Sequence, residues 1–137
     1  MIQKSSIKGK TVTISGLVVK GQQYGRLLGF PTANLDRRSY SRRKQNIKLG
    51  IYAGTAEIGN QKLEIRNYPA GIIIGPIDKE GLPKLEAHLI GFKGNLYGKK
   101  ITVTLQKFLR PFKKFKSEVE LKKQIKFDIQ RVRELES

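Results

Sequence analysis

The 137-residue sequence has no cysteine and no tryptophan, and it contains a single histidine. Without cysteine, the chain offers neither disulfides nor thiolate ligands for a metal. One histidine excludes metal sites and mechanisms that need several imidazoles. There is no apolar run near the ~20 residues that a membrane-spanning helix needs, and residues 1–10 lack the apolar core of a secretion signal. We therefore expect a cytoplasmic protein that does not enter a membrane.

Acidic residues are also scarce, because 11 Asp and Glu stand against 28 Lys and Arg, giving a net charge of +17. Such a charge attracts polyanions, including nucleic acid and phosphorylated ligands. It also fits an ordinary solvated surface. One alternative is a basic barrel that binds single-stranded nucleic acid, with tyrosines stacking on bases beside the basic stretch 37–44. The tyrosines considered for this role are Tyr24, Tyr40 and Tyr52.

The length predicts one domain over residues 1–137, and hydrophobic periodicity predicts a β-structured part at about 10–108 and a helix at about 117–135. Alternating or β-branched segments predict six short strands, at 10–20, 51–58, 62–66, 71–76, 85–90 and 101–105. We expect Tyr68-Pro69 to interrupt the chain between two of them, and Asp36–Lys48 to be a loop. Ser117 and Glu120 form a capping box ahead of an apolar stripe at helical spacing. This order predicts a mainly β fold, an antiparallel barrel or sandwich followed by one helix.

The stretch from Gly25 to Leu35 combines two glycines, a proline and small polar side chains. Gly29 lets the backbone approach a ligand closely, and Pro31 stiffens the segment before Thr32. Thr32 and Asn34 are two residues apart, so in an extended chain they face the same side. Their oxygens would suit a hard cation or a phosphate. Spacing alone favours a simpler interpretation, a strand end with a proline turn.

Glu86 lies between the apolar residues Leu85 and Ala87, so its strand should place it opposite them, on the same face as His88. The pattern alone favours a solvent-facing glutamate. A carboxylate there would also serve as a general base that accepts the proton of an alcohol. The sequence contains neither Gly-x-x-x-x-Gly-Lys-Ser/Thr nor Gly-x-Gly-x-x-Gly. A kinase built on this chain would thus need to hold its nucleotide without a P-loop.

The run Gly25-Arg26-Leu27-Leu28-Gly29-Phe30-Pro31-Thr32-Ala33-Asn34-Leu35 resembles the signature of the riboflavin kinase family, which also forms the C-terminal half of bifunctional bacterial FAD synthetases. Three further segments are similar to family motifs. They are Gly50-Ile51-Tyr52-Ala53, the block Glu86–Phe92 with Gly94–Gly98, and the tail Arg110–Phe115 with Leu121, Gln124, Ile125 and Asp128. The resemblance spans about Gly16 to Asp128 and leaves no room for the adenylyltransferase half of the bifunctional relatives.

This resemblance implies a six-stranded antiparallel Greek-key barrel with a C-terminal α-helix. It implies Mg²⁺-dependent transfer of the γ-phosphoryl group of ATP to the riboflavin 5′-hydroxyl, giving FMN, with Glu86 as the catalytic base. Thr32 would ligate the metal and Asn34 would support it. The nucleotide would lie against Arg26, Gly29, Phe30, Pro31 and Thr32, and the flavin against Tyr97, Arg110 and Phe115. The expected partners are ATP and riboflavin, and we expect a monomer.

The chain departs from the family pattern at three places. Asn95 stands where aspartate is usual, in a turn where the two residues are nearly exchangeable. Phe112 replaces a glutamate. Ile72–Ile77 lacks the asparagine and threonine of the family's Asn-Ile-Gly-x-x-Pro-Thr, whose polar ends serve the nucleotide. This last departure leaves open a second alternative, a flavin-binding module with weakened catalysis.

Overall fold

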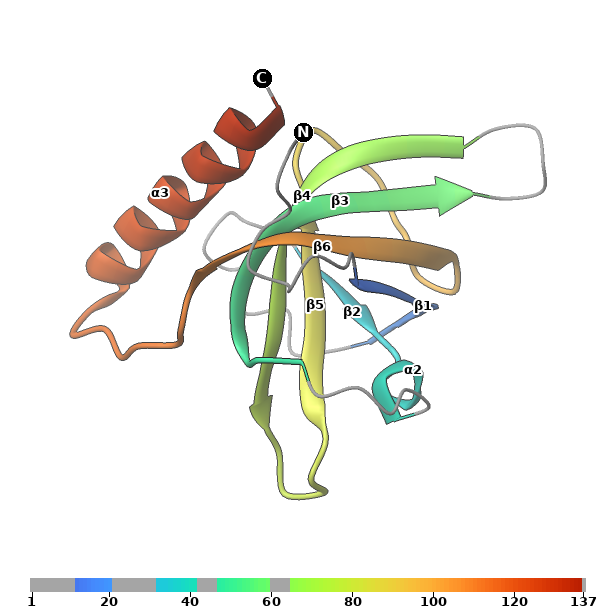
Figure 1. Ribbon diagram of the computed structural model, residues 1–137, viewed down its shortest axis with the longest axis horizontal. Helices are drawn as coiled ribbons and strands as arrows, with labels where there is room; N and C mark the ends of the chain where they lie inside the picture. Colours follow the sequence, from blue (N-terminus) through green and yellow to red (C-terminus); the bar gives the residue numbers. More distant parts are fainter. Residues whose placement is uncertain (1–11, 21–31, 42–46, 60–64, 137) are drawn as a thin grey trace.

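The computed structural model describes residues 12–20, 32–41, 47–59 and 65–136. Within them, six strands close into an antiparallel barrel in the order β1-β2-β5-β4-β3-β6 (Figure 1). The helix α3 (Glu118–Glu136) lies outside the barrel, and a short helix, α2 (Arg38–Ser41), follows β2. The strands are β1 (Val12–Val19), β2 (Ala33–Leu35), β3 (Gly50–Gly59), β4 (Ile65–Ile77), β5 (Pro83–Leu89) and β6 (Lys100–Arg110). This architecture confirms the predicted barrel with its C-terminal helix.

The strand order has Greek-key topology. β3, β4 and β5 pair in succession, and β6 returns to lie beside β3. Alternate residues of the strands fill the barrel, among them Ile14, Ile74 and Leu105, each at most 1% exposed. In β5, Leu85, Ala87 and Leu89 are buried while Glu86 and His88 are half-buried, as the alternation predicts. No helix in the described part of the chain is long and apolar enough to cross a membrane.

The predicted interruption at Tyr68-Pro69 is wrong, because β4 runs unbroken from Ile65 to Ile77. Pro69 pairs with Thr55 of β3, and its carbonyl accepts a hydrogen bond from the Ile90 N–H at 2.9 Å. In a strand, the N–H and C=O of one residue point to the same neighbour. The missing N–H of Pro69 therefore faces β5 where that strand has already ended, so the ladder with β3 loses no bond.

Two further corrections concern residues 32–48. β2 was not among the predicted strands, and it replaces one of the two that merge into β4, so the predicted total of six is met by different segments. The expected loop at Asp36–Lys48 contains α2. The Asp36 carboxylate accepts hydrogen bonds from the backbone N–H and the guanidinium of Arg38, at 3.0 Å and 2.5 Å. Arg37 forms ion pairs with Asp78 and Glu80, which fixes this segment to the β4–β5 turn.

The helix α3 begins where the capping box predicts. The Glu120 N–H donates to the Ser117 hydroxyl at 3.2 Å, and the Glu120 carboxylate accepts from the Lys116 N–H at 3.3 Å. Val132, 1% exposed, packs with apolar residues on the outside of the barrel, including Ile51, Ala53, Ile90 and Leu109. Next to this contact, Arg110 of β6 binds the carboxylate of Asp128, with the closest bond at 2.8 Å. The side-chain amide of Gln124 donates a further hydrogen bond to the Asp128 carboxylate at 3.0 Å.

Gly54 marks the tightest contact between β3 and β6. A Cβ at this position would lie 1.9 Å from the backbone oxygen of Thr104, while a Cβ at Gly71 would meet nothing within 4 Å. We expect Gly54→Ala to lower the free energy of unfolding by about 3 kcal/mol, because backbone must move to admit the methyl group. Gly71→Ala is the matched control and should change it by less than about 1 kcal/mol. Urea unfolding followed by circular dichroism measures both, and equal effects would contradict this account.

The Arg110–Asp128 pair gives a second stability prediction. The two side chains are 15% and 10% exposed, so Asp128→Ala leaves a guanidinium largely out of water without its partner. We expect this change to cost about 3 kcal/mol of unfolding free energy. Gln124→Ala removes only one neutral donor and should cost about 1 kcal/mol. Comparable losses in both variants, in the same urea experiment, would show that the ion pair does not secure α3.

Candidate active site

The pairing of β2 with β5 places Asn34 beside Glu86. Ala33 pairs with Ala87 and Asn34 with Glu86. Ala33 and Ala87 are buried inside the barrel, so Asn34 and Glu86 share the opposite face and are both half-buried. Sequence periodicity predicts each side of this arrangement separately, but only the pairing brings the amide and the carboxylate together.

Thr32 completes the group from the residue before β2. Its hydroxyl donates a hydrogen bond to the Glu86 carboxylate at 3.2 Å, across 54 positions of sequence. The structure thus gathers a hydroxyl, an amide and a carboxylate at one place. A carboxylate in this position can accept a proton from a neighbouring hydroxyl group, and the other two oxygens can contact a cation or a phosphate.

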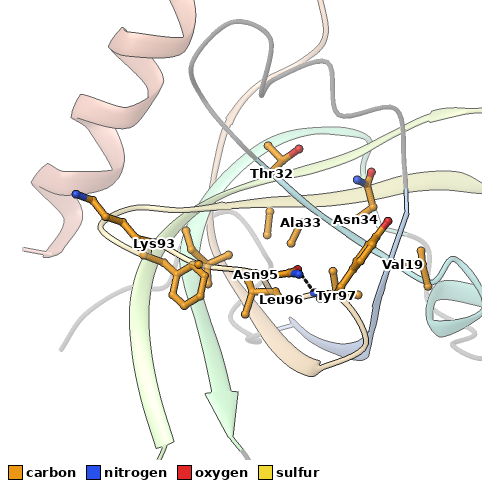
Figure 2. A pocket seen from close by; sticks show the side chains of 13 residues that line it. Val19, Thr32, Ala33, Asn34, Lys93, Asn95, Leu96 and Tyr97 are labelled. Atoms are coloured by element: carbon orange, nitrogen blue, oxygen red, sulfur yellow. Dashed lines mark hydrogen bonds between the residues drawn. The ribbon is translucent and has the colours of Figure 1, made fainter.

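A cavity of about 660 Å³ opens beside Thr32 and Asn34. Figure 2 shows Thr32, Ala33 and Asn34 on one side of it and Asn95, Leu96 and Tyr97 on the other. The apolar part of its wall comes from residues that include Val18, Ala87, Leu89 and Phe92. This volume lies within the range of small-molecule sites, roughly 300–1,000 Å³.

The connection between β5 and β6 forms one wall of this cavity. The Asn95 side-chain oxygen accepts a hydrogen bond from the Tyr97 N–H at 2.8 Å, so an amide closes the turn where the family has a carboxylate. Gly94 and Gly98 adopt φ of 132° and 77°, which side chains disfavour. Sequence reasoning missed Phe92 and Lys93 as lining residues. The available signal was the density of glycine in this connection, next to Glu86.

A second cavity, of about 520 Å³, borders the same group and is lined by Asn34 and Glu86. Its walls are more charged, since Asp36, Arg37, Arg38 and Lys84 contribute to them. The hydrogen bond to Asp36, and then its negative charge, raise the pKa of Arg38 above its usual value. Asn34 lines both cavities, so the Thr32–Glu86 hydrogen bond lies at the boundary between two spaces.

The oxygen atoms of this group suit a hard cation. Thr32, Asn34 and Glu86 present hydroxyl, amide and carboxylate oxygens, and Mg²⁺ prefers oxygen ligands. Within the described residues, no group of three or more His, Cys, Asp or Glu side chains is placed to hold a metal. A bound magnesium ion here would take most of its ligands from water and from phosphate, as this ion commonly does.

The predicted site residues fall into three sets. Arg26, Gly29, Phe30 and Pro31 lie outside the described residues. Tyr97 lies with Thr32 and Asn34, at the larger cavity. Arg110 and Phe115 lie elsewhere, near the β6–α3 junction, with the guanidinium 5.9 Å from the ring centroid. The structure therefore separates Tyr97 from the other two residues predicted to contact the flavin.

The predicted stacking role of Tyr52 is wrong. Tyr52 is 3% exposed, and its ring packs edge-on against Phe108 at 5.2 Å between centroids. Its hydroxyl donates to the Lys48 carbonyl at 2.7 Å. Burial, and then the neighbouring Tyr40, raise the pKa of Tyr52 above its usual value, which favours the protonated phenol that donates this bond. Tyr40 is half-buried against the core, and Tyr24 lies outside the described residues.

Comparison with known proteins supplies the family. Residues 8–136 match the family described as "Flavokinase: Riboflavin kinase". A bifunctional riboflavin kinase/FMN adenylyltransferase of Mycoplasma pneumoniae is 36% identical over 115 residues, covering 83% of this chain and 39% of that protein. An RNA-binding riboflavin kinase of Bacillus subtilis is 39% identical over 118 residues, covering 85% and 47%.

A solved structure agrees with these matches. The riboflavin kinase of Trypanosoma brucei superposes with a TM-score of 0.64 at 26% identity, covering 92% of this chain and 80% of that one. The chain spans less than half the length of the two curated relatives named above. Because the family match covers nearly all 137 residues, the chain belongs to the riboflavin kinase family.

Proposed function

We propose that this chain is a riboflavin kinase, which transfers the γ-phosphoryl group of ATP to the 5′-hydroxyl of riboflavin and forms FMN. The observation that carries this proposal is the 3.2 Å hydrogen bond between the Thr32 hydroxyl and the Glu86 carboxylate. It joins two of the four segments that carry the family resemblance, and Asn34 lies beside it in the ladder. A base, a phosphate-side hydroxyl and an amide thus meet at one point between two cavities.

In this proposal Glu86 acts on the alcohol. A primary alcohol is a weak nucleophile at neutral pH, and a carboxylate within hydrogen-bond reach orients it and accepts its proton during phosphoryl transfer. The carboxylate is half-buried, so it is partly shielded from water while remaining accessible to a substrate. The hydrogen bond from Thr32 fixes one of its oxygens, which leaves the other for the incoming hydroxyl group.

Thr32 and Asn34 would hold the magnesium ion, which supplies positive charge to the phosphates of ATP. We assign ATP to the larger cavity, because Thr32 and Asn34 both line it. Arg26 and Gly29–Thr32 would contact the nucleotide there. The flavin would extend from Glu86 towards Arg110 and Phe115. Tyr97 lines the cavity assigned to ATP, so this arrangement places it with the nucleotide, although the family resemblance implies that it contacts the flavin.

Three of the four isoleucines in the segment that departs from the family pattern have a structural explanation, while Ile77 is exposed. Ile72 and Ile74 are 1% and 0% exposed inside the barrel, and Ile73 packs with the cluster beneath α3. Apolar residues at these positions stabilise β4 and leave Thr32, Asn34 and Glu86 in place. We therefore favour an active kinase over a flavin-binding module with weakened catalysis. Riboflavin binding without FMN formation would select the latter.

The first test is Glu86→Gln, which keeps the shape of the side chain but removes the base. We expect kcat for FMN formation to fall by about 10²- to 10⁴-fold with little change in KM. Chromatographic detection of FMN after incubation with riboflavin, ATP and Mg²⁺ gives the rate. Glu57→Gln, at a half-buried glutamate on β3 that lines neither cavity, is the control. Full activity of the Glu86→Gln variant would show that Glu86 is not the catalytic base.

Thr32 gives a second, independent test. Thr32→Ala removes the hydroxyl, and we expect it to raise the Mg²⁺ concentration for half-maximal rate by about tenfold, while Thr32→Ser keeps that oxygen and should restore most of the affinity. The measurement is the rate of FMN formation against Mg²⁺ concentration at saturating ATP. An unchanged Mg²⁺ dependence in Thr32→Ala would show that this hydroxyl does not serve the metal.

Binding of single-stranded nucleic acid is a second candidate function. Two observations favour it: the net charge of +17 and the similarity to an RNA-binding riboflavin kinase. The chain's predicted platform on Tyr52 is excluded by burial, so a different surface must carry this function.

A further inference from the structure

The outer face of α3 is a continuous exposed surface, which we define by Lys122, Lys123, Lys126, Phe127, Gln130 and Arg133. The opposite side of the helix faces the barrel through Asp128 and Val132, which are both buried. Figure 1 shows α3 along one flank of the barrel, and no residue of this face lines either of the cavities bordered by Thr32 and Glu86. Nothing in the proposed kinase reaction uses this face.

The charge of this face is of one sign. Residues 121–133 contain five basic side chains and one acid, Asp128, which is buried and bound to Arg110. The ion pairs among the described residues are made by arginines, and Lys122, Lys123 and Lys126 take part in none of them. Lys122 and Lys126 are four residues apart on the helix, where like charges repel. The helix therefore keeps an uncompensated positive surface.

The nearby acids have a local explanation. Glu118 and Glu120 lie in the first turn of α3, where the helix dipole favours negative charge, and Glu120 belongs to the capping box. Before that turn, Lys113, Lys114 and Lys116 are exposed. Exposed cations therefore lie on both sides of the helix start, in the connection after β6 and along α3.

A large aromatic ring lies among these cations. Phe127 is 57% exposed, and the Arg131 guanidinium lies 5.7 Å from its ring centroid. Lys123, Phe127 and Arg131 follow one another at helical spacing, so they form one stripe. Exposed aromatic rings flanked by arginine and lysine provide stacking surfaces for unpaired bases while the cations bind the phosphates.

The length of this surface fits a polymer rather than a single phosphate. At 1.5 Å per residue, Lys122 and Arg133 are about 16 Å apart along the helix axis. Because Lys122 and Lys126 are four residues apart, they lie in a row along one face of the helix, as the phosphates of an extended strand do. An acidic protein segment would satisfy the cations too, but it would leave the exposed ring without a planar partner.

We propose that the outer face of α3 is a binding surface for single-stranded nucleic acid, with Lys122 and Lys126 on phosphates and a base stacked on Phe127. This rests on the second candidate function above and is independent of the kinase reaction. It assigns a partner to the strong positive charge of the chain, which the site around Glu86 does not explain.

The experiment is fluorescence anisotropy with a labelled RNA of about 20 nucleotides without self-complementarity. The double variant Lys122→Gln/Lys126→Gln should raise Kd about tenfold at low salt and make the slope of log Kd against log salt shallower by about 1.4, the value for two lost phosphate contacts. Phe127→Ala should also raise Kd about tenfold but leave the salt slope unchanged, because stacking carries no charge.

The matched control is Lys79→Gln/Lys100→Gln, which removes the same charge from exposed positions on the β4–β5 turn and at the start of β6. Its Kd should change less than threefold. An equal loss in the control, or unchanged binding by both α3 variants, would place the RNA elsewhere and overturn this proposal. Equal affinity for the annealed duplex would exclude stacking on Phe127, and competition by polyglutamate as strong as by RNA would indicate an acidic protein partner.

The kinase assay separates this proposal from the kinase function. FMN formation should be unchanged in the two α3 variants and in the lysine control, since none of the substituted residues lines the cavity beside Thr32 or the one beside Glu86. RNA binding by a chain that forms no FMN would overturn the kinase proposal alone. Absence of RNA binding by the unmodified chain at low salt would overturn both the α3 surface and the second candidate function.

Discussion

Closure of the barrel depends on β2, which has three residues. On one edge it pairs with β1 through Val18↔Leu35 and Val19↔Asn34, and on the other it pairs with β5 through Ala33↔Ala87 and Asn34↔Glu86. The neighbouring seams are longer, since β1 and β6 share six paired positions and β4 and β5 also share six. The residues of the candidate active site therefore lie at one of the two shortest seams among the described strands. The hydrogen bond from Thr32 to Glu86 extends this seam by one side-chain contact.

The rest of the structure holds this seam in position from both sides. Beyond β2, Arg37 binds Asp78 and Glu80 on the β4–β5 turn, so the chain leaving β2 is fixed to the strand pair that carries Glu86. On the opposite flank, α3 is attached through Arg110, Asp128 and the apolar residues around Val132. A buried ion pair often adds little net stability, and its clearer effect is to fix the positions of the two elements that it joins. Here that geometry fixes where the helix lies against the barrel.

Features governed by local periodicity could be predicted from the sequence, and features governed by pairing could not. The faces of β5 follow from alternation, and the start of α3 follows from Ser117 and Glu120, because both are decided within a few residues. Three residues are too few for a periodic signal, so β2 was missed. Pro69 misled for a related reason, since its missing N–H matters only if a partner strand lies on that side. The exposure of Tyr52 depends on Phe108, which is distant in sequence.

The meeting of Thr32 with Glu86 belongs to the second kind, because 54 residues separate them. No local pattern predicts that contact, and only the family resemblance pointed to it. Its position has a thermodynamic consequence. A ligand that touches both residues bridges β2 and β5, so it binds the closed barrel in preference to an opened one. Ligand binding and folding are then linked, so the melting temperature of the protein should rise with the logarithm of the ligand concentration. The melting temperature therefore measures how much of the protein carries ligand.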